Sequence, residues 1–200
     1  MEELKPGLWT WTAPHPEWTP DSEGWEREVR SYAYDAGDSL VLFDPLVDVA
    51  DVQELAAGRP VTIVLTCRWH PRSSATLAER LGASVHAPAA AAERLGLEAL
   101  PYELGEDLPG DVEPQTGGYE DEATLWLREH AALVTGDVFL GGEVGFHVQP
   151  DSWLEDGMTH GELRDRLRPL LELPVELLLP THGDPVLDDA HAILERALDT

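Results

Sequence analysis

The segment VTIVLTCRWHPR, residues 61–72, places a thiol, an indole, an imidazole and two guanidinium groups directly after an apolar run. The run is typical of a strand buried on both faces, so the residues after Thr66 form a loop at its end. Cys67 and His70 offer a sulfur and a nitrogen, which can hold a metal ion, attack a carbonyl carbon or move a proton. Which of these they do depends on the groups beside them.

Polar side chains also follow three other apolar runs. Asp44 follows SLVLF, Asp137 follows AALVT after one glycine, and His182 follows VELLLP after one threonine. Residues just beyond the strand ends of an α/β sheet share one rim of that sheet. We therefore expect Asp44, Cys67, Asp137 and His182 to converge on one site.

Short strand patterns alternate with helical patterns along the chain, which predicts a layered α/β domain. The expected strands are residues 8–12, 29–34, 39–43, 61–66, 83–87, 111–116, 123–127, 131–135 and 175–179. The expected helices are residues 51–57, 75–82, 89–95, 160–171 and 188–198. Because no linker or fixed repeat interrupts this alternation, residues 1–200 are expected to form a single domain.

The composition restricts the partners and the compartment. A net charge of −26, from 39 acidic and 13 basic residues, argues against nucleic acid and anionic lipid as partners. The sequence has no apolar run of about 18 residues and no basic segment followed by an apolar one, so we expect neither a membrane span nor a secretory signal. The single cysteine, Cys67, excludes an intrachain disulfide and fits a reducing cytoplasm. These features favour an acidic cytoplasmic protein that binds a small molecule or another protein.

Four pieces of the chain, in order, resemble the metallo-β-lactamase superfamily. They are SLVLFDP, VTIVLT, ALVTGDVFLGG and LLLPTHGDPV, and the resemblance spans residues 8–198. It implies an α/β (α+β) fold, a four-layer αβ/βα sandwich, with a metal site on the rim between its two sheets. In this resemblance Asp137 stands at the aspartate that bridges the metals, and His182 at the last histidine ligand.

The metal motif of that family, Thr-His-x-His-x-Asp-His, is mostly replaced in this chain. With Thr66 on the threonine, Cys67 and Trp69 stand at the first two histidines, Pro71 at the aspartate and Arg72 at the last histidine. A further family histidine falls near residues 117–120, where this chain has none, although Glu120, Asp121 and Glu122 are close. The resemblance thus implies a degenerate member that has lost the dinuclear site.

Three functions follow from these residues. The first is a metal-free protein that keeps the fold and a rim pocket for a small molecule or a protein partner. The second is a hydrolase of an ester, thioester or lactone with one zinc, iron or manganese ion on Asp137, His182 and either Cys67 or His70. The third is a metal-independent enzyme with Cys67 as nucleophile and His70 or His182 as base. The sequence alone does not decide whether the chain is an enzyme.

Arg72 bears on the choice between a metal and no metal. A guanidinium and a carboxylate form a strong bidentate pair, so we expect Arg72 to replace the metal as the partner of Asp137. The alternative for Cys67 is a small buried apolar residue, and Asp44 is expected to fix the backbone at its strand end.

The loops give less information. Trp18, Trp25 and Trp69 are candidates for an apolar wall near the rim, whereas His15 is expected at the surface or as a capping residue. Residues 13–28 and 138–159 carry no recognisable motif, and the sequence therefore does not name a substrate.

Overall fold

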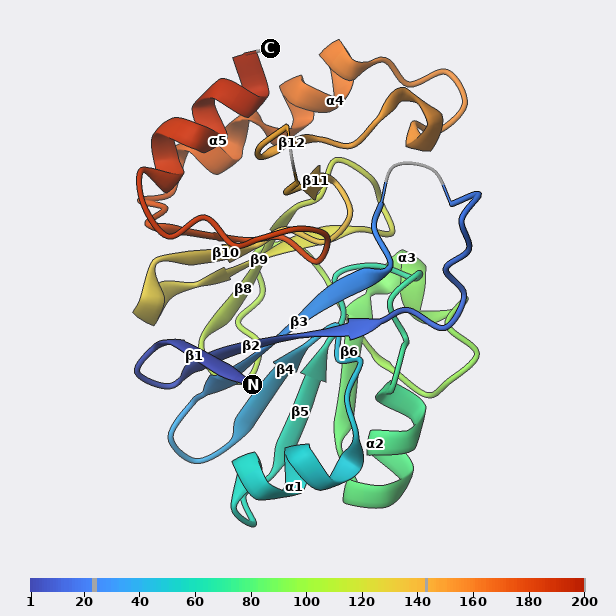
Figure 1. The fold of residues 1–200 in the computed structure, drawn as a ribbon, viewed down its shortest axis with the longest axis vertical. Helices are drawn as coiled ribbons and strands as arrows, with labels where there is room; N and C mark the ends of the chain where they lie inside the picture. The colour runs from blue at the N-terminus through green and yellow to red at the C-terminus, as the bar shows by residue number, and fades with distance from the viewer. Residues whose placement is uncertain (23–24, 143, 200) are drawn as a thin grey trace.

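Two β-sheets lie face to face between two layers of helices (Figure 1). The computed structural model describes residues 1–22, 25–142 and 144–199. In these ranges the first sheet has seven strands, in the order β1 to β7. They are β1 (Glu2–Lys5), β2 (Leu8–Pro14), β3 (Glu28–Asp35), β4 (Leu40–Phe43), β5 (Val61–Val64), β6 (Ser84–Pro88) and β7 (Leu100–Tyr102).

The second sheet comes from the residues after β7, whereas the helices come from both halves of the chain. The remaining strands are β8 (Val112–Thr116), β9 (Ala123–Leu127), β10 (Ala132–Val134), β11 (Phe139–Leu140), β12 (His147–Val148) and β13 (Leu177–Leu179). Within the described ranges the second sheet has the order β13-β10-β9-β8, and β11 pairs with β12 alone. The α-helices are α1 (Val49–Ala56), α2 (Ser74–Leu81), α3 (Ala89–Ala92), α4 (His160–Leu167) and α5 (Ala190–Asp199). Three short 3₁₀ helices among the described residues are η1 (Arg128–His130), η2 (Asp151–Trp153) and η3 (Arg168–Glu172).

The apolar pattern of the central strands explains the four layers. Successive side chains of a strand point to opposite faces of the sheet. In β4, Val41 and Phe43 join the core between the two sheets, whereas Leu40 and Leu42 pack with residues of α1 and α2 on the outer face. Each sheet therefore needs a cover on both faces, and the expected αβ/βα sandwich is confirmed.

The second sheet follows the same logic. Val134 of β10 and Leu179 of β13 face the first sheet, whereas Leu133 and Leu178 pack against the layer that contains α4 and α5. In Figure 1 these two helices lie at the opposite end of the molecule from α1 and α2. The strands that lead to the candidate site thus pack their inward side chains into the core between the two sheets.

Parallel pairing brings the predicted strand ends together. β4 pairs in parallel with β5, and β10 pairs in parallel with β13, so each pair ends at one edge of its sheet. The Thr66 carbonyl accepts a hydrogen bond from the Ala123 amide at 2.8 Å, which links the first sheet to the second at that edge. The rim between the sheets is therefore where the polar residues meet.

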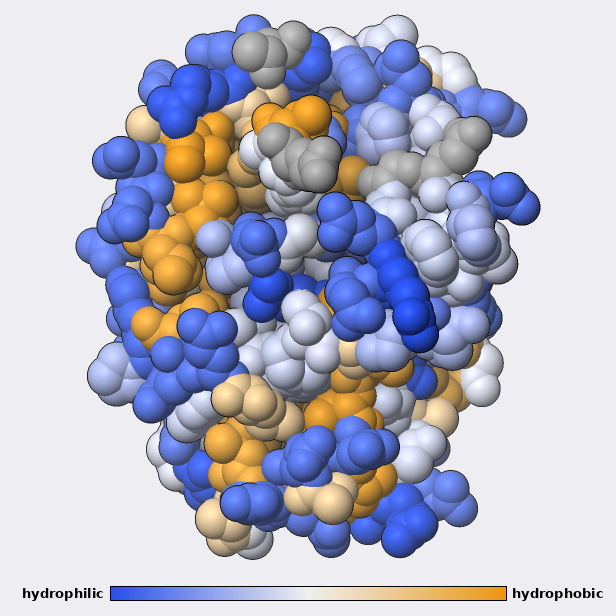
Figure 2. Space-filling view, viewed as in Figure 1, coloured by the Kyte–Doolittle hydropathy of each residue, from blue (hydrophilic) through white to orange (hydrophobic). Residues whose placement is uncertain are grey.

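Hydrophilic side chains cover much of the face shown in Figure 2, and apolar residues gather in separate areas of it. This distribution fits a chain with a net charge of −26. None of the helices in the described part of the chain is long and apolar enough to cross a membrane.

Candidate functional site

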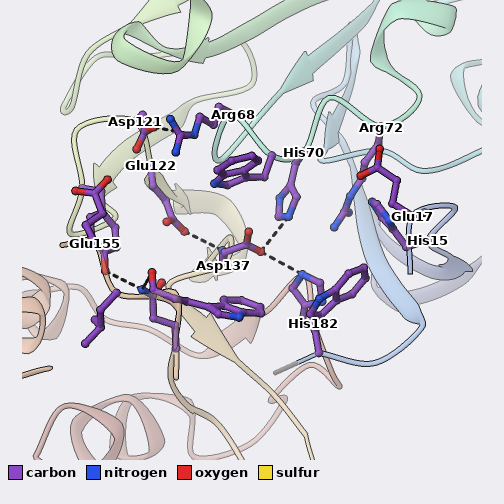
Figure 3. A pocket seen from close by; sticks show the side chains of 16 residues that line it. His15, Glu17, Arg68, His70, Arg72, Asp121, Glu122, Asp137, Glu155 and His182 are labelled. Atoms are coloured by element: carbon purple, nitrogen blue, oxygen red, sulfur yellow. Dashed lines mark hydrogen bonds and ion pairs between the residues drawn. The ribbon is translucent and has the colours of Figure 1, made fainter. Parts of the chain in front are cut away.

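A cavity of about 510 Å³ opens at the rim between the two sheets. Most of its lining side chains are charged, aromatic or histidine side chains (Figure 3). They are His15, Glu17, Trp25, Arg68, Trp69, His70, Arg72, Tyr119, Asp121, Glu122, Asp137, Gln149, Trp153, Leu154, Glu155 and His182. The strand-end residues expected to converge therefore do so, with Cys67 and Asp44 behind the lining.

Asp44 ties the end of β4 to the loop after β5. Its Oδ1 accepts the Thr66 amide at 2.9 Å, and its Oδ2 accepts the Thr66 hydroxyl at 2.6 Å. The same Oδ2 lies 3.0 Å from Nδ1 of His70. Asp44 thus fixes the backbone, as expected, and also fixes the orientation of the His70 ring.

Asp137 is the centre of the site. Its Oδ1 lies 3.0 Å from Nε2 of His70 and 3.1 Å from Nε2 of His182, and its Oδ2 lies 3.9 Å from Sγ of Cys67. The ligand atoms of Cys67, His70 and Asp137 all lie within 4.8 Å of one another. Cys67 and His70 were the two alternatives for the third metal ligand, and both lie beside Asp137.

The loop that carries Asp137 is held at its backbone. Gly136 has a φ of 59°, and a Cβ there would come within 2.9 Å of both Glu122 Oε1 and Thr66 Oγ1, so only glycine fits. Glu122 Oε1 accepts the amides of Asp137 and Val138 at 2.8 and 2.7 Å. Glu122 is a site residue that the sequence did not single out, although the acidic run at 120–122 was close to the missing family histidine.

The electrostatics of Asp137 and His70 are coupled. Burial raises the pKa of Asp137, but the His70 charge and hydrogen bonds from His182 and His70 outweigh it and hold the pKa well below the usual value. Burial and the Arg72 charge lower the pKa of His70, but the Asp137 and Asp44 carboxylates outweigh them and raise it well above 6.5. In the metal-free site His70 is therefore an imidazolium between two carboxylates.

The other titratable groups favour their neutral forms. Burial lowers the pKa of His182, against the opposing effect of Asp137. Burial, together with the Asp137 charge, raises the pKa of Glu122 well above its usual value. Burial also raises the pKa of Cys67 to about 12, so without a metal the group is a thiol.

The expected pairing of Arg72 with Asp137 is wrong. Nη1 of Arg72 donates to the carbonyls of Arg30 at 2.9 Å and Asp44 at 2.8 Å, at the ends of β3 and β4. These backbone acceptors hold the guanidinium, while both imidazoles face the same oxygen of Asp137. The cation beside Asp137 is His70, although its position in the motif is one residue away from a ligand position.

Loops without a recognisable motif build much of the cavity wall. His15 packs edge-on against Trp25, with ring centroids 5.2 Å apart, and Trp25 packs edge-on against His182 at 5.3 Å. His15 Nδ1 also accepts a hydrogen bond from the Glu17 amide at 3.3 Å, so His15 has the expected capping role and lines the cavity as well. Trp25 and Trp69 line the cavity as expected, and Trp153 from the second loop joins them. Residues 23, 24 and 143 of these loops lie outside the described ranges.

Trp18 and Trp69 take different positions at the rim. Trp18 donates from Nε1 to the Trp25 carbonyl at 3.3 Å and is not one of the lining residues. Trp69 lines the cavity and remains 64% exposed, with the Arg68 guanidinium 4.2 Å above its ring. Arg68 is in turn paired with Asp121 at 3.2 Å.

No protein-family model matches the sequence, and no curated protein matches it. Solved structures do match. A metallo-β-lactamase family protein from Thermus thermophilus is 22% identical over 98% of this chain and 78% of that chain, with a TM-score of 0.67. TTHA1623 in a di-iron-bound form is 24% identical over 85% of this chain and 93% of that chain, with a TM-score of 0.62.

A third match is the metallo-β-lactamase FIM-1 from Pseudomonas aeruginosa in its mono-zinc form. It is 13% identical over 98% of this chain and 92% of that chain, with a TM-score of 0.70. The three likenesses agree with the order of layers and show that this chain has the metallo-β-lactamase fold. At these identities they establish the fold alone.

Proposed function

From the metallo-β-lactamase fold as premise, we propose that this chain is a hydrolase that holds one metal ion on Cys67, His70 and Asp137. The observation that carries the proposal is the meeting of these three donors within 4.8 Å at the rim, where His70 and Asp137 line the cavity and Cys67 lies behind them. The reaction adds water across an ester, thioester or lactone bond and yields a carboxylic acid with an alcohol or thiol. The di-iron and mono-zinc forms of the two matched proteins support a metal in this fold.

The donor set fits zinc. A catalytic zinc ion takes three protein ligands from sulfur, imidazole nitrogen and carboxylate oxygen, and it keeps one position open. Nδ1 of His70 lies 3.0 Å from the Asp44 carboxylate. A carboxylate on the far side of a ligand histidine commonly orients the ring toward the metal. When bound, the ion would polarise the substrate carbonyl and make a water molecule more acidic.

A single ion is proposed in place of the family's pair. Trp69 and Pro71, at two positions of the family motif, offer no ligand atom. Among the residues that the structure describes, Cys67, His70 and Asp137 form the one group of three or more candidate ligands whose donor atoms all lie within 4.8 Å of one another. This degenerate motif supports a mononuclear site.

His182 is proposed to handle a proton, in place of its expected role as a ligand. Its Nε2 faces Asp137 at 3.1 Å, which places the ring proton on Nε2 and leaves Nδ1 as an acceptor. Nδ1 is buried and has no hydrogen-bond partner among the described residues. Because its pKa is lowered, the ring is neutral near pH 7 and can take up a proton at Nδ1.

The aromatic side chains would bind the apolar part of the substrate. Trp25, Trp69, Trp153 and Tyr119 line one cavity with the three histidines. Their rings supply a large apolar area at little cost in side-chain entropy and keep water from the reacting bond.

The second candidate function is the metal-free pocket that binds a small molecule or a protein partner without hydrolysis. The raised pKa of His70 favours it, since an imidazolium can take the place of the metal beside Asp137. Binding a metal at Nε2 requires that proton to leave. A Cys67 nucleophile has no support from the geometry, because the thiol does not line the cavity and its pKa is about 12.

The remaining proposals concern location and partners. A cytoplasmic location is supported by Cys67, which is the single cysteine of the chain and is free. The absence of nucleic acid and anionic lipid partners is supported by the net charge of −26.

A hydrolysis assay with metal reconstitution tests the proposed function. Chelator-treated protein is given zinc, iron(II) or manganese(II) and is then incubated with p-nitrophenyl acetate, a thioester and a γ-lactone. We expect hydrolysis of one class that needs metal and falls by about 100-fold or more in Asp137→Ala. If activity were equal in chelator-treated and metal-loaded protein, or persisted in Asp137→Ala, the proposed function would be wrong.

A further inference from the structure

Two of the three guanidinium nitrogens of Arg72 have no hydrogen-bond partner in the described part of the chain. Nη1 is anchored by the carbonyls of Arg30 and Asp44. Nε and Nη2 are buried and have no hydrogen-bond partner among the residues that the structure describes. An arginine that only tied two strand ends together would need Nη1 alone, so the second pair of donors requires its own explanation.

The two unpaired nitrogens form one edge of the planar group. Nε–H and Nη2–H point in nearly the same direction, at the spacing of the two oxygens of a carboxylate. Nη1, on the other edge, is fixed and prevents the group from rotating away. The chain therefore presents a rigid bidentate donor.

The Asp44 and Asp137 charges favour the charged form of Arg72, but neither carboxylate contacts the guanidinium directly. In the described ranges no acidic side chain forms an ion pair with it; the nearest candidates, Asp44 and Asp137, are both occupied by His70. His70, His15 and His182 add no acceptor charge, and Tyr32 donates its hydroxyl to the Pro180 carbonyl. The cost that remains is that of two buried N–H groups without an acceptor among the described residues, and a ligand carboxylate would supply an acceptor to each.

Arg72 lines the same cavity as His70 and Asp137, two of the proposed metal ligands, and Figure 3 shows it beside His15, Glu17 and His70. We propose that the free Nε and Nη2 edge of Arg72 binds a carboxylate of the ligand. Resting on the proposed function, this names the substrate class as an ester, thioester or lactone that carries a carboxylate. The subsite itself does not need the metal, because Arg72 is not one of the ligands.

Calorimetric binding of phenylacetate tests the subsite, with phenylacetamide as the neutral isostere. Each is titrated into chelator-treated and zinc-loaded protein, so that binding to zinc is separated from binding to Arg72. We expect phenylacetate to bind in both states and phenylacetamide to bind at least about tenfold more weakly. Arg72→Lys, which keeps the charge and loses the fork, should weaken phenylacetate binding by about tenfold.

Arg128→Gln is the matched control. Arg128 is not one of the cavity-lining residues, and its guanidinium already pairs with Asp107 and Glu113. We expect it to change phenylacetate affinity by less than about threefold. Equal binding of acid and amide by the wild-type protein, or an Arg72→Lys affinity equal to that of wild type, would overturn the carboxylate subsite.

A second readout uses the wild-type protein alone and covers the case in which the Arg72 variant does not fold. The Nε–H signal of Arg72 in ¹⁵N NMR should shift on addition of phenylacetate and stay in place with phenylacetamide. A signal that ignores both would contradict the proposal. If the protein takes up no metal but passes these binding tests, only the proposed function is wrong. If it binds metal but fails these tests, only the carboxylate subsite is wrong.

Discussion

The two sides of the candidate site differ in how completely their buried polar atoms are hydrogen-bonded. On one side, Asp44 accepts hydrogen bonds from the amide and the hydroxyl of Thr66. Each ring nitrogen of His70 faces a carboxylate, Asp44 at Nδ1 and Asp137 at Nε2. On the other side, Arg72 and His182 leave buried nitrogens without partners among the described residues. A satisfied network holds a site in shape, whereas an unsatisfied edge indicates where a ligand or a proton is to be received.

The largest effect on stability is expected on the satisfied side. Asp44→Ala removes the acceptor of three contacts and leaves the His70 charge less well paired, so the free energy of unfolding should fall by about 3–5 kcal/mol. Urea denaturation of the chelator-treated protein measures it. Glu54→Ala, on an exposed position of α1, is the control and should stay within about 0.5 kcal/mol. A similar small change for Asp44→Ala would remove the distinction between the two sides.

Metal affinity separates the sides further. Asp44→Asn keeps the shape of the side chain but weakens the orientation of His70, so zinc affinity should fall by about 10–100-fold. Arg72→Lys lies on the unsatisfied side, and its zinc affinity should match that of wild type. Competition with a fluorescent chelator measures both. A larger loss in Arg72→Lys than in Asp44→Asn would reverse the comparison.

In chelator-treated protein the contributions of His70 and His182 to stability should change with pH in opposite directions. The pKa of His70 is raised, so its contribution to stability is complete below pH 6.5 and is lost as pH rises through the folded-state pKa. The pKa of His182 is lowered, so its contribution is complete above pH 6.5 and is lost as pH falls. At pH 7, ¹⁵N NMR should therefore show a doubly protonated His70 and a neutral His182.

Stability as a function of pH checks the same difference. His70→Gln should flatten the fall in the free energy of unfolding above pH 6.5, because glutamine carries no titrating proton. A neutral His70 at pH 7, or an unchanged slope in the variant, would show that the carboxylates do not hold its charge.

The smallest effect is expected at the rim. Trp69 is 64% exposed, so Trp69→Ala should change the free energy of unfolding by less than about 0.5 kcal/mol. Phenylacetate affinity should still fall by roughly two- to tenfold, because the ring contributes apolar contact area. Calorimetry measures the affinity, and an unchanged value would exclude Trp69 from the ligand contacts.

The fold was largely predictable because apolar runs and strand-end residues are local signals. The runs that became β4, β5, β9 and β13 were recognised with small errors at their ends. β1, β7, β11 and β12 were missed, since they are only 2–4 residues long and have mixed polarity.

The sequence predicted four of the residues that meet at the rim, but it missed Glu122 and Trp153 and the pairings within the site. Asp137, His182, Cys67 and His70 were all identified, because each follows or lies near an apolar strand. The position of Arg72 in the motif suggested a contact with Asp137. Its Nη1 instead donates hydrogen bonds to the carbonyls of Arg30 and Asp44. Such backbone acceptors, and the loop residue His15 across the cavity, are brought close only by tertiary packing.

The most direct test of the central claim is a cobalt(II) titration of chelator-treated protein followed by absorption spectroscopy. If Cys67, His70 and Asp137 hold one metal ion, a sulfur-to-cobalt charge-transfer band should grow and saturate at about one equivalent. The band should be absent in Cys67→Ser. No saturable band in the wild-type protein, or the same band in Cys67→Ser, would contradict the claim.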